Sequence, residues 1–237
     1  MAENPFDGPY GTGETEYELY LRTRELLGLQ KPASKRLHKD ELLFQCVHQV
    51  EEIWMKLIVH QMGEAIAHMD DGRLAQAVAA IKRAHAAQEL CASGLRMFEH
   101  MPPNSYIDIR KGLGRGSGLD SPGYNRMNEI APAIWQGFER AVEAAGGDLV
   151  TMYEDPTSQP ELFALAEALC TYDSQMIRFK REHIMVVRRI IGMGTSSLRG
   201  GNPIDMLERS AQLTYFPMLW AVRDRLFIDF KAGELAT

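Results

Sequence analysis

Hydrophobic residues along this chain recur every three or four positions rather than every second position. Spacing of three and four places apolar side chains on one face of an α-helix, whereas a strand requires alternation. Clusters of β-branched and aromatic residues typical of strands are missing. The pattern therefore predicts an all-α helical bundle, with helices at about residues 14–28, 38–70, 73–99, 105–113, 124–145, 160–191 and 203–230.

Two glycine-rich stretches, residues 112–123 and 192–202, interrupt this helical pattern. Glycine is a poor helix former and adopts conformations closed to other residues, so both stretches are predicted to be loops. Loops held by a rigid scaffold commonly carry binding residues. We therefore expect both stretches to contribute to a binding site.

The segment from 160 to 191 carries the most regular apolar stripe. Ser158 is a candidate N-terminal cap, Pro160 suits a first helical turn, and Gly192 suits a C-terminal stop. His183 occupies a core position of the stripe, between Phe179 and the following valine. The opposite face is expected to carry the cations Arg178, Lys180, Arg181, Arg188 and Arg189.

Composition limits the classes of protein that this chain can represent. The 237 residues contain 26 Lys+Arg against 32 Asp+Glu, a net charge of −6 that argues against a nucleic-acid partner. No apolar run approaches the roughly 20 residues that a membrane span requires, and the polar N-terminus shows no secretion signal. Three widely spaced cysteines fit reduced thiols. We predict a single cytoplasmic domain spanning residues 1–237, with residues 1–13 flexible.

The seven histidines were tested for metal-ligand spacing. Di-iron helical bundles place Glu three positions before His, and no histidine here has that neighbour. HExxH and CxxCH motifs are also absent from the sequence. His183, on an apolar stripe with arginines at its margin, fits instead the axial ligand of a non-covalent haem. The simpler alternative is a hydrogen-bonded core histidine, which is the commoner role of a lone histidine on an apolar face.

Other residues suggest a site for an aromatic amino acid. Phe44 and His48 lie one turn apart on a helix flank, which suits a planar ligand with a ring nitrogen, although taken alone the pair is more simply explained as a solvated flank. Tyr106 and Arg110 are also four apart, and a guanidinium beside a phenol suits a carboxylate. Arg110 could equally be an exposed helix arginine. The first predicted helix carries an aromatic face formed by Tyr17, Tyr20 and Leu21. Core packing is the alternative explanation for this face.

Several motifs occur in a characteristic order and spacing. They include Tyr17-Glu-Leu-Tyr20-Leu21, His38-Lys-Asp40-Glu41-Leu-Leu-Phe44, His48-Gln49, Trp54-Met-Lys56, Tyr106 to Arg110, Gly116-Ser117-Gly118, Arg181-Glu-His183-Ile-Met-Val-Val-Arg188, Gly194-Thr195 and Phe216-Pro217-Met-Leu-Trp220. Together they resemble the tryptophan 2,3-dioxygenase family of haem enzymes. The resemblance implies an all-helical fold that encloses haem b and uses O₂.

The resemblance also implies roles for individual residues. His183 matches the proximal haem ligand, and His48 matches the distal, catalytic histidine that meets the indole N–H. Phe44 matches the ring packed on the indole, and Arg110 with Tyr106 matches the group that grips the substrate carboxylate. Further residues are expected to bind substrate, namely Leu113, Ser117, Gly118 and Thr195. In the family's tetramers, a first-helix face matching Tyr17, Tyr20 and Leu21 reaches a neighbouring subunit's pocket.

Some features depart from the family pattern. The chain is shorter than usual between Tyr124 and Asp155, and Leu119-Asp120-Ser121 replaces the usual residues after Gly118. The leading hypothesis is a homo-oligomeric, tetrameric oxygenase that inserts O₂-derived oxygen into the indole ring of L-tryptophan or a derivative, giving N-formylkynurenine. One alternative is a haem monooxygenase that hydroxylates an indole, tryptophan or tyrosine derivative in secondary metabolism. Another is a haem carrier or sensor without turnover.

Overall fold

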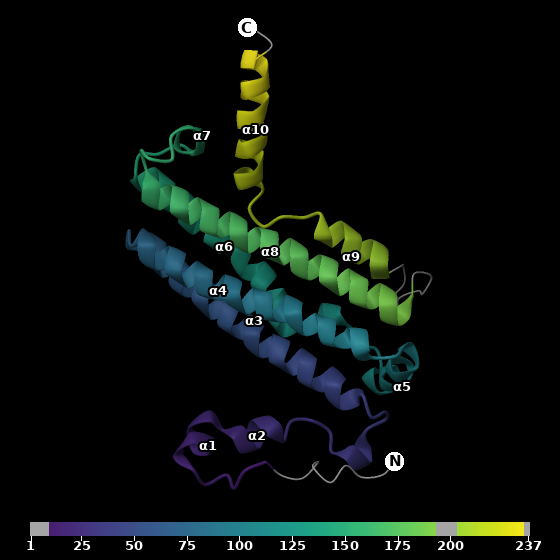
Figure 1. Cartoon of the computed structure of the whole chain (residues 1–237). Coiled ribbons are helices and arrows are strands. Elements are labelled where there is room, and N and C mark those ends of the chain that lie inside the picture. The colour runs from purple at the N-terminus through teal and green to yellow at the C-terminus, as the bar shows by residue number, and fades with distance from the viewer. Residues whose placement is uncertain (1–9, 193–202, 235–237) are drawn as a thin grey trace.

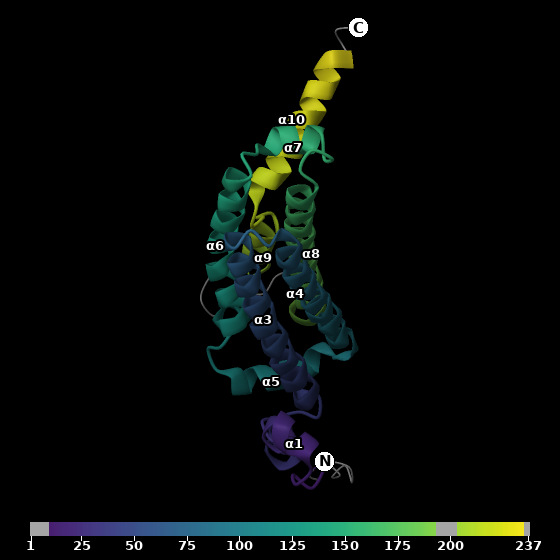
Figure 2. The ribbon, with the colours of Figure 1, turned by 90° about the vertical axis from the view of Figure 1, so that its left-hand side faces the viewer.

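The computed structural model describes residues 10–192 and 203–234, and no strand occurs among them. Four long helices form the body (Figure 1): α3 (Glu41–Asp70), α4 (Leu74–Leu95), α6 (Pro122–Ala144) and α8 (Pro160–Ile191). Helices α3 and α6 run in one direction, and α4 and α8 run in the opposite direction. Helix α3 packs against both α4 and α6, and α4 packs against α8 (Figure 2). The predicted all-α class is confirmed. No helix in the described ranges is long and apolar enough to cross a membrane.

The bundle core combines small and flexible side chains. Helix α4 turns a row of alanines inward, including Ala77, Ala80, Ala84 and Ala87, which lets the neighbouring helices approach closely. Helix α8 supplies the large partners, among them Leu165, Leu169, Tyr172 and Met176, all buried as the apolar stripe predicted. Large side chains facing small ones fill the space between the helices.

The N-terminal region departs from the predicted single helix over 14–28. It forms α1 (Glu16–Leu21) and α2 (Thr23–Leu27), followed by the 3₁₀ turn η1 (Ala33–Lys35). A capping box between Thr15 and Glu18 starts α1, and Arg22, with φ of 53°, ends it in the left-handed region. Neither helix buries a residue. The sequence pattern could not show this break between α1 and α2 at Arg22.

The connection from α4 to α6 is built from short helices. The predicted helix 73–99 ends instead as the 3₁₀ helix η2 (Arg96–His100), which precedes α5 (Pro103–Leu113) and the 3₁₀ turn η3 (Gly118–Asp120). Pro103 occupies the first turn of α5, where its missing N–H is harmless. The Ser105 hydroxyl donates to the Asp40 carboxylate at 2.8 Å, which ties α5 to the start of α3.

The C-terminal region contains more helices than predicted. Helix α7 (Leu149–Glu154), capped by Asp148, was not predicted, and the expected helix 203–230 is α9 (Pro203–Ala211) followed by α10 (Pro217–Glu234). The break between them is fixed from α8, because the Asp173 carboxylate accepts the backbone N–H groups of Tyr215 and Phe216. Helix α10 then extends away from the bundle (Figure 1).

Two predictions about α8 were wrong in detail. Ser158 does not cap the helix, because its hydroxyl donates to the backbone oxygen of Asp155. Lys180 is buried rather than on a solvated face, since its ammonium donates to the backbone oxygens of Ser210 and Leu213. Pro160 and Gly192 do mark the ends, and Gly192 has φ of 82°.

Candidate functional site

A cluster of aromatic rings lies where the start of α3 meets η2 and α5. The rings of Phe44 and His48 have centroids 4.2 Å apart, and Phe98 of η2 lies 5.2 Å from His48. Tyr106 of α5 lies 6.2 Å from Phe44. Phe44, His48, Phe98 and Tyr106 are called the ring pocket below. Its rings come from three separate elements, so their convergence depends on tertiary packing.

The imidazole of His48 has a defined tautomer. Its Nδ1 lies 2.8 Å from the backbone oxygen of Phe44, and a carbonyl oxygen only accepts hydrogen bonds. The hydrogen of a neutral ring therefore sits on Nδ1, and Nε2 is left as an acceptor. Desolvation lowers the pKa of His48, which keeps the ring neutral at pH 7. The ring pocket thus offers a hydrogen-bond acceptor suited to a ring N–H.

His183 faces the same region from α8. Burial lowers its pKa to about 4, and the nearby imidazole of His48 adds to this effect, so the two histidines lie close enough to interact. The ring of Phe179, one turn earlier, stacks at a centroid distance of 6.5 Å. Within the described part of the chain, no hydrogen bond engages either nitrogen of His183. A neutral, enclosed imidazole with free nitrogens is chemically ready to bind a metal.

The glycine-rich loop between α5 and α6 approaches His183. A Cβ at Gly118 would lie 3.8 Å from Cε1 of that histidine, so the glycine brings bare backbone close to the imidazole. Glu52 of α3 anchors the far end of the loop by accepting from the Ser121 hydroxyl and the Gly123 N–H. Gly123 is required there, because a Cβ would come within 2.7 Å of Met55 Cβ.

Arg110 lies beside the ring pocket on α5. Burial raises the pKa of Tyr106, and the Arg110 guanidinium is near enough to oppose that rise. One guanidinium nitrogen of Arg110 donates to the backbone oxygen of Gly114 at 2.9 Å. Within the described residues, its other N–H groups remain available to a ligand. Leu113 is the last residue of α5. Ser117 lies on the exposed loop that follows, where it forms a capping box with Asp120.

Several residues expected at the site lie elsewhere. Tyr17, Tyr20 and Leu21 are exposed on α1, and the 87% exposure of Tyr20 shows that it contacts almost nothing within one chain. Helix α1 sits beyond the end of the bundle (Figure 1). Thr195 lies outside the described residues.

Phe98 was missed by the sequence reasoning, although its ring lies within 6 Å of both Phe44 and His48. It follows Gly94 by four positions on the inner side of a helix that changes to 3₁₀ geometry. The sequence gives no signal for this role, because it does not show which side chains an aromatic residue at a helix end will contact.

The structure defines the class of protein before any comparison. In the described ranges no group of three or more His, Cys, Asp or Glu side chains is arranged to hold a metal ion. The single imidazole of His183, facing the ring pocket, fits instead a prosthetic group that brings its own remaining ligands. The molecule is thus a helical bundle in which one buried imidazole lies near a cluster of aromatic rings.

Comparison with known proteins agrees with that class. A model of the family "Tryptophan 2,3-dioxygenase" matches residues 7–131. The tryptophan 2,3-dioxygenase of Xanthomonas oryzae pv. oryzae (strain PXO99A) is 26% identical over 274 aligned residues, covering 94% of this chain and 91% of the relative. That of Myxococcus xanthus (strain DK1622) is 27% identical over 268, covering 90% of each. The chain belongs to the tryptophan 2,3-dioxygenase family, as its motifs indicated.

Proposed function

We propose that the protein is a haem-dependent oxygenase that opens the indole ring of L-tryptophan, or of a derivative, to give the N-formylkynurenine type of product. One observation carries the proposal: the neutral imidazole of His183, which makes no hydrogen bond within the described residues, lies near a cluster of aromatic rings that includes a second neutral imidazole. Family membership and the names of the relatives support it.

His183 would hold haem b through its free nitrogen. A pKa of about 4 keeps that nitrogen unprotonated throughout the physiological range, so protons do not compete with the metal. Bound there, the haem iron would supply the chemistry with O₂. Phe179 stacks beside the imidazole with a centroid distance of 6.5 Å. The chain itself contributes binding, orientation and exclusion of water.

His48 would position the substrate ring. Its Nδ1–H is held by the Phe44 carbonyl, so Nε2 is presented to the pocket as an acceptor for the indole N–H. The rings of Phe44, Phe98 and Tyr106 provide flat apolar surfaces against which an indole can pack. An indole N–H is a weak acid, so the role of His48 is orientation rather than deprotonation. Correct placement of the reacting carbons supplies much of the rate.

Arg110 would bind the carboxylate of the substrate. Its guanidinium is planar and permanently charged, and Tyr106 next to it offers a hydroxyl group. In this proposal Thr195 completes the amino-acid subsite, and it is closed by Leu113 at the end of α5 and by the loop residues Ser117 and Gly118. Anchoring the amino-acid end fixes which edge of the indole is presented.

A second candidate is a haem monooxygenase that hydroxylates an indole, tryptophan or tyrosine derivative. The alignment with the Xanthomonas relative spans 274 residues against the 237 of this chain, so that relative contains segments missing here. Residues 118–120, near His183, form a 3₁₀ turn with a polar Asp120. A changed pocket wall can change which atom of a ring reacts.

The exposed face of α1 supports assembly of several copies. Tyr17, Tyr20 and Leu21 expose apolar surface that a single chain leaves uncovered, and such patches mark interfaces. We place this face against the ring pocket of a neighbouring copy in a homotetramer. The three cysteines are all free thiols, which fits a cytoplasmic enzyme.

Labelled oxygen separates the candidate functions. The reduced, haem-loaded protein is mixed anaerobically with tryptophan, a substituted indole or tyrosine, exposed to ¹⁸O₂, and the product is analysed by mass spectrometry. Two labelled atoms in a ring-opened product support the dioxygenase, and one labelled atom supports the monooxygenase. Consumption of no O₂ with any of these compounds would identify a carrier or sensor and would overturn the proposal.

A further inference from the structure

Glu52 joins α3 to the glycine-rich loop that leads into α6. It lies one turn after His48, and its carboxylate accepts from the Ser121 hydroxyl through Oε1 and from the Gly123 N–H at 2.9 Å through Oε2. Ser121 caps α6, and its hydroxyl in turn accepts the Tyr124 N–H at 3.1 Å. One carboxylate on α3 therefore fixes the first turn of α6 and the end of the loop before it.

Segment 117–123 is held together by its own hydrogen bonds. The Ser121 N–H donates to the backbone oxygen of Gly118 at 3.2 Å. The Ser117 N–H donates to the Asp120 carboxylate at 2.9 Å, which closes the capping box around the same 3₁₀ turn. A displacement of Ser121 is therefore passed to Gly118, at the other end of this short turn.

Two contacts connect this segment to His183. A Cβ at Gly118 would lie 3.8 Å from Cε1 of the imidazole. Tyr124, which directly follows the segment, has its ring 6.4 Å from that of Phe179, and Phe179 stacks on the imidazole at 6.5 Å. The position of segment 117–123 therefore decides how much space is left beside His183.

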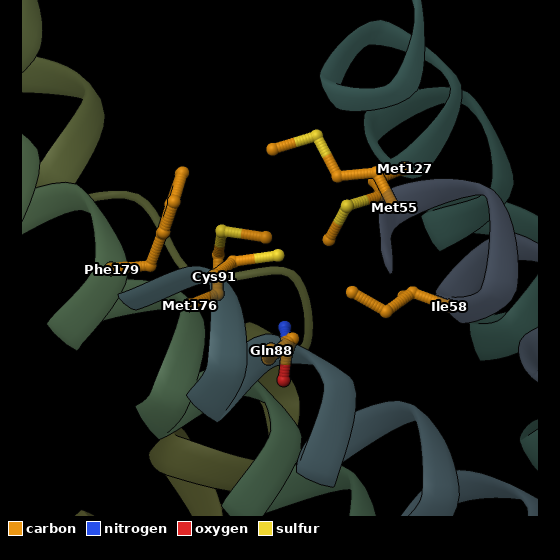
Figure 3. Close-up of a pocket in the computed structure, with 7 residues that line it drawn as sticks. All are labelled: Met55, Ile58, Gln88, Cys91, Met127, Met176 and Phe179. Carbon is orange, nitrogen blue, oxygen red and sulfur yellow. The ribbon is translucent and has the colours of Figure 1, made fainter. Parts of the chain in front are cut away.

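Packing alone specifies this position weakly. A small cavity lies between α3, α4, α6 and α8, with Met55 and Met127 on one side and Met176 and Phe179 on the other (Figure 3). Methionine side chains are flexible and fill irregular space without imposing one arrangement. Hydrogen bonds, in contrast, depend on distance and direction. The two bonds to Glu52 are thus the contacts that define where the segment lies.

The rest of α6 is held on α3 without Glu52. Near the far end of α6, Arg140 forms an ion pair with Asp70 at 2.6 Å, and a Cβ on Gly137 would lie 3.0 Å from Cε of Met69. Loss of the Glu52 hydrogen bonds should therefore release the first turn of α6 and the segment before it, while the bundle stays folded.

We propose that Glu52 is a positioning residue that sets the selectivity of the site: it holds segment 117–123 beside His183 and so limits which ring-substituted substrates fit. The inference rests on the proposed function only for the statement that an indole-type substrate enters this space. A pocket wall that is held in place rejects an added methyl group, whereas a wall that is free to shift accepts it. Glu52 acts through the backbone that it holds, not by contact with the substrate.

The haem-free protein tests the positioning part. Histidine labelled with ¹³C at Cε1 gives one NMR signal for each imidazole, and the His183 signal is assigned by its loss in His183→Ala. Glu52→Leu removes both acceptors and should shift or broaden this signal and speed amide exchange at Ser121. Glu64→Leu, at an exposed position of the same helix, should change neither. An unchanged His183 signal in Glu52→Leu overturns the proposal, even if exchange at Ser121 is faster, because Glu52 then only stabilises α6.

Two further variants separate hydrogen bonding from folding. Glu52→Gln keeps both links, because its amide oxygen can accept from Gly123 and its amide nitrogen can donate to the Ser121 oxygen, so the wild-type His183 signal should return. Ser121→Ala keeps only the Gly123 bond and should give a smaller shift; it replaces Glu52→Leu if that variant does not fold. A Glu52→Gln signal displaced as far as that of Glu52→Leu, or a wild-type signal in Ser121→Ala, would contradict the proposal.

The selectivity part is measured on the haem-loaded protein with tryptophan and with methyl-substituted tryptophans that differ in the position of the methyl group. In Glu52→Leu the preference for tryptophan, as a ratio of kcat/KM values, should fall about 10-fold against at least one of them, and Glu64→Leu should keep the wild-type ratios. Unchanged ratios in Glu52→Leu overturn the selectivity role. If the wild-type protein oxidises none of these compounds, the proposed function fails, and the His183 signal still decides whether Glu52 positions the segment.

Discussion

At the scale of single residues, the site depends on what each imidazole nitrogen can do. His48 has one nitrogen committed to the Phe44 carbonyl, whereas His183 makes no hydrogen bond in the described part of the chain. Both rings have pKa values lowered by burial, so both are neutral at pH 7. In the proposed function, this difference in hydrogen bonding suits His48 to orienting the substrate and His183 to binding the metal.

Replacing Arg110 tests the amino-acid subsite. Arg110→Ala should raise KM for tryptophan by about 10- to 100-fold, because a hydrogen bond to a charged group contributes roughly 1.5–3 kcal/mol. KM for an indole without a carboxylate should change little. Steady-state kinetics on both substrates give the comparison, with Lys111→Ala, on the exposed side of α5, as the control. An equal rise in KM for both substrates would show that Arg110 does not bind the substrate carboxylate.

Two buried groups make stability depend on pH in opposite directions in the haem-free protein. Folding lowers the pKa of His183 from 6.5 to about 4. The stability that its neutral form provides is therefore fully present above pH 6.5 and is lost as the pH falls toward 4. Folding raises the pKa of Glu51 from 4.5 to about 8. The stability that its protonated form provides is therefore fully present below pH 4.5 and is lost as the pH rises toward 8.

Glu51→Gln should therefore gain stability relative to the wild-type protein as pH rises from 5 to 8. The difference in the free energy of unfolding should change by at most about 1.4 kcal/mol per pH unit, the limit for a single group. Urea denaturation at pH 5, 6, 7 and 8 measures it. A difference that is constant with pH would mean that Glu51 is ionised in the folded protein as it is in the unfolded chain.

At the scale of elements, the long helices could be predicted from the sequence and their interruptions could not. The apolar stripe of α8 includes His183 at a core spacing, and the helix ends at Pro160 and Gly192 as expected. The break between α9 and α10 depends on Asp173, a residue more than 40 positions earlier in the chain. Phe98 joins the ring pocket through contacts that cross between elements, which no periodicity reveals.

The turn between α9 and α10 should be sensitive to Asp173. This fully buried carboxylate accepts hydrogen bonds from the Tyr215 and Phe216 N–H groups and from the Trp220 indole. Asp173→Ala should cost about 3–5 kcal/mol of stability, because several buried donors lose their partner. Thermal or urea unfolding measures the loss, and Asp71→Ala on the surface should cost about 0.5 kcal/mol or less. Equal costs would contradict the role of Asp173.

At the scale of the whole molecule, a single chain leaves the aromatic face of α1 exposed. Tyr17 and Tyr20 are exposed on α1, whose main contact within the described residues is with α2, beyond the end of the bundle (Figure 1). Residues 28–40 join α2 to α3, and this connection is fixed by hydrogen bonds such as that from the Lys31 N–H to the side-chain oxygen of Gln45. Helices α1 and α2 are therefore held beyond the end of the bundle, where the exposed aromatic face of α1 is available to another copy.

Changing the α1 face should weaken assembly without unfolding the bundle. Tyr17→Ser combined with Tyr20→Ser is expected to shift the protein from tetramer to smaller species, because apolar interface area is lost. Light scattering after size exclusion gives the mass, and circular dichroism should show unchanged helix content. A wild-type protein that is monomeric at micromolar concentration, or a double variant that is still a tetramer, would contradict this arrangement.

The central claim is that His183 holds the haem, and titration of the haem-free protein with haem tests it most directly. The account predicts a saturable Soret band with one haem per chain for the wild-type protein and for His48→Ala. His183→Gly should lose that band and recover it when free imidazole is added, because the small ligand fills the space of the missing side chain. A His183→Gly protein whose Soret spectrum matches that of the wild type would contradict the account.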